Sequence, residues 1–273
     1  MNKKIKSLNS QLNNLAALDT IKRQMMLIAE NRIRYTGIPS TVDMSYVNKV
    51  LIERGAVAFF ADEILGFLIL PFNLIGKLDC YGNPTTIQCY SVNGYVSKIL
   101  KKNEYAILWD NTSKISLLKD IYILAERMAI ATRTMDINIS QQKTPRFFKT
   151  STENEQTVKK IINNVDTYEN LVVTFDNIAI DDFSVVLSPA PYITDKLYDY
   201  YDRLWAEFLR LIGMNSITST KKERLLTDEI RYSQGGALLT RESFLSTRER
   251  WIKEVAEKFN VIITYEYADL EKE

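Results

Sequence analysis

The residues best suited to chemistry form a short basic cluster at 221–224 (KKER), which follows a small polar stretch at 215–220 (NSITST) and precedes Gly235-Gly236. Lysine and arginine contact phosphate groups without reading base sequence. Glycines among small polar residues indicate a flexible connection. The cluster fits a loop that touches a polyanion, but a short charge run of this kind is usually a solvated surface loop.

Enzymatic chemistry has little support in this sequence. Histidine is absent, which removes the commonest general base and the commonest metal ligand. Cys80 and Cys89 flank a turn and are too few to bind zinc by themselves; an intracellular chain keeps them as thiols. No phosphate-binding or dinucleotide-binding glycine motif occurs. We therefore expect no enzyme, no catalytic residues, no metal site and no cofactor.

The composition is typical of a soluble globular protein with one large or two moderate domains. The chain has 273 residues, of which 46% are hydrophobic and 25% charged, and its formal net charge is +1. Proteins that wrap nucleic acid tightly usually carry a strong basic excess, which is missing here. The N-terminus has no apolar core of a signal peptide, and the longest apolar run, 64–75, is too short to span a bilayer.

An amphipathic helix precedes the basic cluster. Pro191 suits a first helical turn, and Gly213 suits a left-handed C-terminal stop. The opposite face is charged, and Lys196, Arg203 and Arg210 lie on it. The apolar stripe, which fits a core or a subunit interface, consists of Ile193, Leu197, Tyr200, Tyr201, Leu204, Trp205, Phe208, Leu211 and Ile212.

The remaining pattern predicts a mainly α fold with β strands (α+β). We expect a small antiparallel sheet or barrel at 56–110, where short apolar runs alternate with turns. A second helix is expected to begin after the cap Asp43 and to end at Gly55. Further helices are predicted at 7–34, 113–139, 153–165 and 240–259, and strands at 171–175, 183–187 and 261–265.

Several separated motifs resemble one family, the portal proteins (head–tail connectors, or upper collars) of φ29-like small podoviruses. The resemblance covers roughly residues 20–265, and the motifs share the family's order and spacing. They are IPSTVDMSYVNKVLIERGAVAFFAD at 38–62, QKTP at 142–145, APY at 190–192, DKL at 195–197, KKER at 221–224 and TDE at 227–229.

The resemblance implies a portal fold with long channel helices, a small β-barrel-like wing and an αβ clip insertion. It divides the chain into an N-terminal helix (1–37), the wing (38–112), a channel helix (113–145), the clip (146–188), a second channel helix (189–214), a lumen loop (215–239), and a C-terminal helix and strand of the wing or crown (240–273).

The implied function is a homo-oligomeric ring, a dodecamer in that family, at one vertex of the virion capsid. The ring is assembled in the host cytoplasm and conducts double-stranded DNA, without sequence specificity, during packaging and ejection. The implied partners are capsid and scaffolding proteins, the packaging ATPase and the lower collar or tail proteins, with no membrane. The family's basic N-terminal arm docks a packaging RNA. Here only Lys3, Lys4 and Lys6 remain of it, which leaves an RNA partner open.

The resemblance also implies the DNA contacts. Family lysines that face the channel fall on Lys196, Lys221 and Lys222, with Arg224 beside them, whereas a further one falls on Leu187. The lumen loop would include Thr218, Ser219, Thr220, Glu223, Gly235 and Gly236.

Two other classes fit parts of the sequence. A non-portal neck or tail adaptor ring would share the oligomeric state but lack the helical funnel. A monomeric nucleic-acid-binding protein is disfavoured by the low net charge and by the tyrosine-rich helical stripe.

Overall fold

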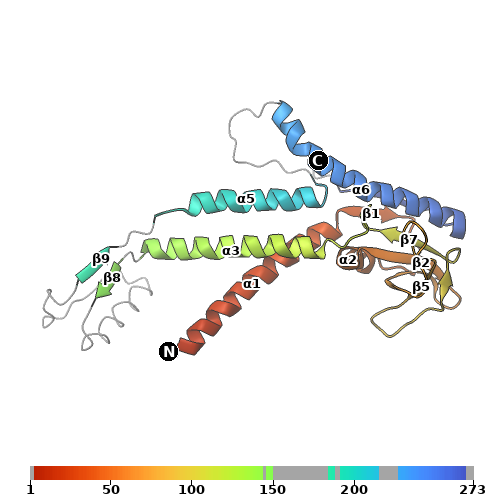
Figure 1. The fold of residues 1–273 in the computed structure, drawn as a ribbon, viewed down its shortest axis with the longest axis horizontal. Coiled ribbons are helices and arrows are strands. Elements are labelled where there is room, and N and C mark those ends of the chain that lie inside the picture. The colour runs from red at the N-terminus through yellow and green to blue at the C-terminus, as the bar shows by residue number, and fades with distance from the viewer. Residues whose placement is uncertain (1–2, 144–145, 150–183, 188–190, 215–226, 269–273) are drawn as a thin grey trace. The chain divides into compact units, whose positions relative to one another are not determined.

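The computed structural model describes residues 3–143, 146–149, 184–187, 191–214 and 227–268 (Figure 1). The chain divides into two compact units. Unit 1 combines residues 1–129 with 202–273, and unit 2 consists of residues 130–201. Helices and strands both contribute, which confirms the predicted α+β class.

The first helix, α1, spans Lys3–Glu30. Ile21, Met25 and Ala29 are buried at four-residue steps, so they lie on one face of the helix. Leu15, nearer the N-terminus of the helix, is 61% exposed.

The prediction that this helix continues to Arg34 is wrong. Strand β1 (Ile33–Thr36) follows α1 and pairs antiparallel with β10 (Thr264–Tyr267), with Ile33 opposite Tyr267. The partner strand lies far away in the sequence, and tertiary pairing of this kind outweighs a local helical pattern.

Helix α2 spans Met44–Arg54, as the sequence predicts. The Asp43 carboxylate accepts from the backbone N–H of Ser45 at 2.9 Å, the usual N-cap interaction. Gly55 ends the helix with a φ of 82°, the left-handed conformation that glycine adopts without strain.

The region after α2 forms two three-stranded antiparallel sheets, which confirms the predicted small antiparallel region. One has the strand order β3-β2-β7 and the other β4-β5-β6. Their strands are β2 (Ala56–Asp62), β3 (Gly66–Leu70), β4 (Phe72–Leu74), β5 (Thr86–Cys89), β6 (Leu100–Lys101) and β7 (Tyr105–Trp109).

Strand β2 contributes to two hydrophobic cores of unit 1, because its successive side chains point to opposite faces. Val57 and Phe59 belong to the larger core, which includes Trp251 and Val255. Phe60 belongs to a smaller core that includes residues of the second sheet. The larger core joins the β3-β2-β7 sheet to α2 and to the long helix α6 (Thr227–Phe259). Helix α6 packs against β7 (Figure 1).

Helix α3 spans Leu118–Lys143 and begins later than the predicted residue 113. Lys114 has a positive φ of 57°, which interrupts helical geometry, and the Ser116 hydroxyl accepts from the N–H of Leu118 at 3.1 Å. The serine side chain therefore satisfies a backbone donor in the first turn of the helix. Its buried face includes Ile121, and Met128 is also fully buried.

Unit 2 contains the second part of α3, a two-stranded sheet and the first part of α5 (Thr194–Leu211). Strand β8 (Arg146–Lys149) pairs antiparallel with β9 (Ser184–Leu187). The predicted strand at 183–187 is confirmed by β9, whereas the sequence analysis missed β8. The predicted helix at 153–165 and strand at 171–175 lie outside the described residues.

The prediction that the last helix begins at Thr240 is wrong, because α6 begins at Thr227. Gly235 and Gly236 therefore lie inside a helix, and neither has a positive φ. Each glycine costs a helix only about 1 kcal/mol relative to alanine. The neighbouring Ala237 is buried, so packing compensates for that cost.

Candidate nucleic-acid interface

The structure places part of the predicted interface. Lys196 is exposed in the first turns of α5. Gly235 and Gly236 belong to α6. The remaining predicted residues lie outside the described part of the chain: Thr218, Ser219, Thr220, Lys221, Lys222, Glu223 and Arg224.

A row of three cations follows one face of α5. Lys196, Arg203 and Arg210 are all exposed and are spaced seven residues apart. Seven residues make almost two turns, or about 10 Å along the axis, so the three side chains share a face. Among the described residues, none of the three side chains makes an ion pair or a hydrogen bond. The sequence analysis placed Arg203 and Arg210 on the polar face without selecting them, although the seven-residue spacing would have identified them.

The row is not purely basic. Asp199 is half-buried and Glu207 is exposed on the same side of the helix, next to the cations. In water the field of each exposed charge is screened within about 8–10 Å at physiological salt. Such a face supports weak and reversible contacts with phosphates rather than tight binding.

The opposite face of α5 fixes the orientation of this row. Leu204 and Phe208 are buried at a four-residue step, and Ile212 follows directly after the helix. The rings of Trp205 and Phe208 lie 5.5 Å apart. The predicted amphipathic stripe is therefore confirmed over these turns, and its burial leaves the charged face in solvent.

The end of α5 is held by two elements of unit 1. Gly213 has a φ of 76°, and a Cβ there would lie 2.9 Å from the Cα and N atoms of Arg241. The Arg241 Nε donates to the Gly213 carbonyl at 3.1 Å, and its guanidinium stacks 4.2 Å from the centre of the Tyr267 ring. The Tyr267 hydroxyl donates to the carbonyl of Ile212. The chain thus leaves α5 toward residues 215–226 from a fixed point.

The beginning of α5 is held within unit 2 by one buried side chain of α3, Asn138. Its oxygen accepts from the N–H of Ile193 at 3.1 Å and from the hydroxyl of Thr194 at 3.0 Å. Its amide nitrogen donates to the carbonyl of Pro191 at 2.9 Å. Asn138, a residue of α3, therefore caps the N-terminus of α5.

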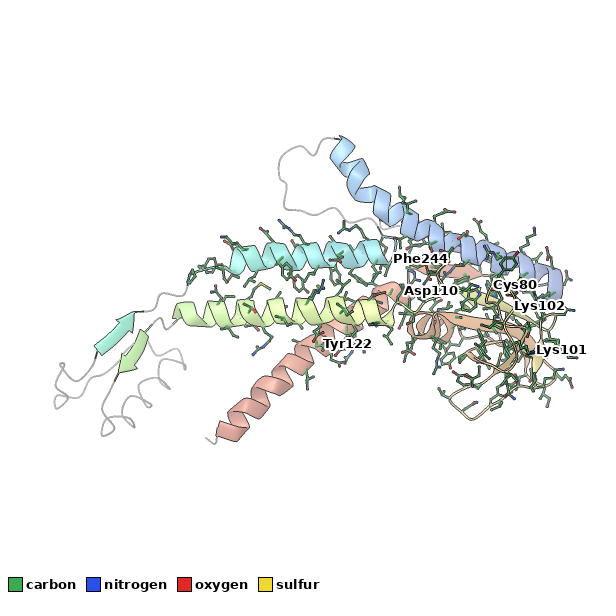
Figure 2. The ribbon with its side chains drawn as sticks, in the orientation of Figure 1. Cys80, Lys101, Lys102, Asp110, Tyr122 and Phe244 are labelled. Carbon is green, nitrogen blue, oxygen red and sulfur yellow. The ribbon has the colours of Figure 1, made fainter. Side chains whose placement is uncertain are left out.

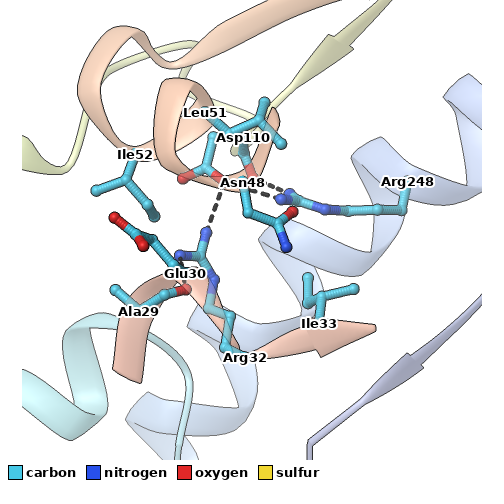
Figure 3. Close-up of a pocket in the computed structure, with 9 residues that line it drawn as sticks. All are labelled: Ala29, Glu30, Arg32, Ile33, Asn48, Leu51, Ile52, Asp110 and Arg248. Atoms are coloured by element: carbon cyan, nitrogen blue, oxygen red, sulfur yellow. Dashed lines mark hydrogen bonds and ion pairs between the residues drawn. The ribbon is translucent and has the colours of Figure 1, made fainter. Parts of the chain in front are cut away.

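Unit 1 contains a buried cluster of three charged side chains (Figure 3). The guanidinium groups of Arg32 and Arg248 both donate to Oδ1 of Asp110, at 2.5 and 2.8 Å. All three side chains are at most 2% exposed. Arg32 also stacks on the ring of Phe244, 4.3 Å from its centre, near Asp110 in Figure 2. The cluster joins β1, β7 and α6, which are distant in sequence.

The charged groups of this cluster have a structural role. Burial lowers the pKa of Arg32, and the attraction of the Asp110 carboxylate works against that effect. Arg248 also donates through Nε to the hydroxyl of Tyr35 at 3.1 Å. Sequence analysis missed the cluster, because buried charged residues are rare and carry no local pattern.

The remaining reactive groups do not form a site within the described residues. Both cysteines are free thiols, and burial raises the pKa of Cys89 to about 12. No cluster of three or more acidic, histidine or cysteine side chains in the described ranges is arranged to hold a metal ion. None of the helices described is both long enough and apolar enough to cross a bilayer.

The fold is similar to that of phage portal subunits. A chain from the portal and tail of native bacteriophage P68 matches with a TM-score of 0.50 and 16% identity, over 97% of this chain and 92% of that one. An HK97 family phage portal protein from Corynebacterium diphtheriae matches with a TM-score of 0.48 and 10% identity, over 94% of each chain. The virion of a native gene transfer agent particle contains a chain with a TM-score of 0.45 and 11% identity, over 92% of this chain and 80% of that one.

The family of the chain follows from its sequence. Residues 2–269 match the family described as Phage Connector (GP10), so the chain belongs to the phage connector family. It is a component of the phage particle, at the portal that joins head and tail.

Proposed function

We propose that this connector works as a portal subunit of the φ29-like type. Copies form a closed ring at one capsid vertex, and double-stranded DNA passes through it during packaging and ejection. The observation that carries this proposal is the family match over residues 2–269, which leaves almost none of the chain unmatched. The ordered resemblance of the six sequence motifs supports the φ29-like subtype.

The exposure of apolar side chains in unit 2 supports a ring. Among residues 130–139 and 191–201, whose side chains the structure describes, Ala131 is the one buried apolar residue. Large apolar side chains stay exposed on both helices and just before α5: Ile130, Ile137, Ile139, Tyr192, Tyr198 and Tyr200. Exposed apolar surface of this kind marks protein–protein contacts. Neighbouring copies in the ring would cover it.

The family suggests the assembly and the partners. We expect a dodecamer that binds capsid and scaffolding proteins at its wide end, and the packaging ATPase and then the lower collar or tail at the clip. A packaging RNA remains an open partner, since the basic N-terminal arm is reduced to three lysines.

The DNA contacts follow from the cations on α5 and from the basic cluster at 221–224. Each neutralised phosphate adds about 0.9 to the slope of log affinity against log salt. A ring of simultaneous contacts would therefore hold DNA too tightly for a conduit. We propose sparse, transient contacts by Lys196, Lys221, Lys222 and Arg224, extended along α5 by Arg203 and Arg210.

The first experiment is native mass measurement with two-dimensional class averages of the purified protein in moderate salt. Closed rings with a central hole wide enough for duplex DNA would support the portal function. A protein that stays monomeric at high concentration, even with scaffolding and shell proteins, would contradict it.

The loop contacts are tested separately with Lys221→Ala plus Lys222→Ala. We expect intact rings and altered retention of DNA in packaged heads, and unchanged retention would reject the role of the loop.

A further inference from the structure

A small cavity of about 10 Å³ lies beside the buried charge cluster (Figure 3). Arg32, Asp110 and Arg248 line it, together with the more exposed Glu30 and Asn48. The cavity is about the size that holds one water molecule. These polar side chains distinguish it from a purely apolar cavity, which would stay empty.

Two polar atoms of the cluster have no hydrogen-bond partner in the described part of the chain. They are Nε of Arg32 and Oδ2 of Asp110, and both side chains are almost completely buried. The Nη1 atoms of both guanidinium groups are already used. Arg32 donates through Nη1 to the carbonyl of Ala29 at 3.0 Å, and Arg248 donates through Nη1 to backbone carbonyls of Asp110 and Phe244. A buried donor and acceptor left unpaired would each be strongly unfavourable.

We infer that one ordered water molecule occupies this cavity and completes the cluster. Arg32 Nε–H is a donor, and the carboxylate oxygen Oδ2 of Asp110 is an acceptor. One water molecule accepts from the first and donates to the second. The side chains of Glu30 and Asn48 offer further polar groups for the two to four hydrogen bonds that a buried water makes.

A water molecule fits better than a small anion. The two guanidinium groups outnumber the one carboxylate of the cluster, which would favour an anion such as chloride, but the carboxyl group of Glu30 also lines the cavity and offsets that excess. An anion, however, would lie close to Oδ2 of Asp110, which carries negative charge and has no proton to donate. The cavity also leaves room for about one water-sized sphere and no more. The pairing of one free donor with one free acceptor favours a molecule that does both.

The water would give the cluster a specific structural role. Arg32 directly precedes β1, and Asp110 directly follows β7. With the water in place, these two side chains are joined by the direct bond to Oδ1 and by a second, bridged connection through Oδ2. The bridge would fix the orientation of the Asp110 carboxylate, so that Oδ1 faces both guanidinium groups at once.

The test is a high-resolution map of the assembled protein, by cryo-electron microscopy or crystallography. We expect one isolated peak at hydrogen-bond distance, about 2.7–3.2 Å, from both Arg32 Nε and Asp110 Oδ2. A map of sufficient quality to show other ordered waters, but with no peak there, would overturn the inference. Anomalous signal at that position after exchange of chloride for bromide would overturn it as well, since it would identify an anion.

A matched pair of variants tests the partners. Arg32→Lys removes the Nε donor, so we expect the peak to disappear or move. Arg248→Lys makes a similar change on the other side of Asp110 but keeps both proposed partners, so the peak should stay. Retention in Arg32→Lys, or loss in a folded Arg248→Lys protein, would contradict the assignment. If either variant fails to fold, the map of the unmodified protein still decides the question.

Discussion

Asp110 accepts two guanidinium groups on a single carboxylate oxygen, and the three side chains are sealed from solvent. Removing one partner from such a cluster costs far more free energy than the intact cluster contributes to stability, because the removal leaves an uncompensated buried charge. The exposed ion pairs of this protein differ in this respect. Arg23 and Asp19 lie 2.9 Å apart but are 73% and 68% exposed, where water already solvates both.

Asp110→Asn should therefore destabilise unit 1 severely. The amide keeps the shape but removes the charge that balances Arg32 and Arg248, and we expect a loss of about 3–5 kcal/mol in the free energy of unfolding. Denaturant unfolding followed by tryptophan fluorescence measures it, since Trp251 is buried in the same unit. Asp19→Asn is the control and should cost below about 0.5 kcal/mol. Similar losses in the two variants would contradict the prediction.

Glu30, at the end of α1, should make stability depend on pH. Burial is the main cause that raises the pKa of Glu30 above 4.5, with a smaller opposing effect of Lys49. A raised pKa in the folded state means that folding favours the protonated form. The associated stability is present at acidic pH and is lost as pH rises through the folded-state pKa. Glu30→Gln resembles the protonated form, so we expect equal stability at low pH and higher stability than the native protein at neutral pH. A variant that is less stable at neutral pH would contradict this.

Among the elements, those specified by local residues could be predicted and those specified by distant partners could not. Helix α2 has its cap Asp43 and its stop Gly55 within one short segment, and both bounds were predicted. Strand β1 depends on β10, and no residue near Ile33 encodes that pairing. The two glycines in α6 carry a local signal for a loop, but burial of Ala237 overrides it. The same distinction holds for single residues. The local helical pattern places Lys196 on an exposed face, whereas the buried Arg32–Asp110–Arg248 cluster depends on distant partners and could not be predicted.

Two glycine substitutions, one just after α5 and one inside α6, should change the stability of the protein in opposite directions. Gly213→Ala introduces a Cβ 2.9 Å from the backbone of Arg241, at a φ of 76°. We expect it to destabilise by more than about 1 kcal/mol. Gly236 lies within α6, and a Cβ added there would meet open space, so Gly236→Ala should stabilise by about 0.5–1 kcal/mol. Thermal unfolding of both variants measures the difference. No gain in Gly236→Ala would argue that residues 235–236 are not helical.

Asn138 should control the first turn of α5. Asn138→Ala removes the acceptor for the Ile193 N–H and the Thr194 hydroxyl, and we expect a cost of about 1–2 kcal/mol. Asn138→Asp keeps that acceptor but loses the donor to the Pro191 carbonyl, so its effect should be smaller. Hydrogen exchange at the start of α5 is the measurement. Native protection in the alanine variant would show that the hydrogen bonds of Asn138 are not needed for the start of α5.

For the whole molecule, we propose that the exposed apolar residues of unit 2 contact neighbouring copies in the ring. Ile130 and Ile137 are 61% and 53% exposed in one chain. Burying such a side chain stabilises a contact by about 1.5–3 kcal/mol, so replacing both should shift the assembly equilibrium at least tenfold. Ile130→Ser plus Ile137→Ser should therefore give smaller species in mass photometry at concentrations where native rings persist. Lys196→Ser, an exposed polar position of the same unit, should leave the rings intact. Unchanged rings in the isoleucine variant would place the contact elsewhere.

The pairing of β1 with β10 has a consequence for the time at which a subunit becomes ready. Thr36 is synthesised early, yet its partner Thr264 leaves the ribosome only after almost all of the intervening chain. At about 5–20 residues per second, β1 stays without its partner for about ten seconds or longer. The larger core also waits, because Trp251 and Val255 are made in the same late interval. We therefore expect nascent chains to remain incompetent for association, so that subunits join one another only after their release from the ribosome.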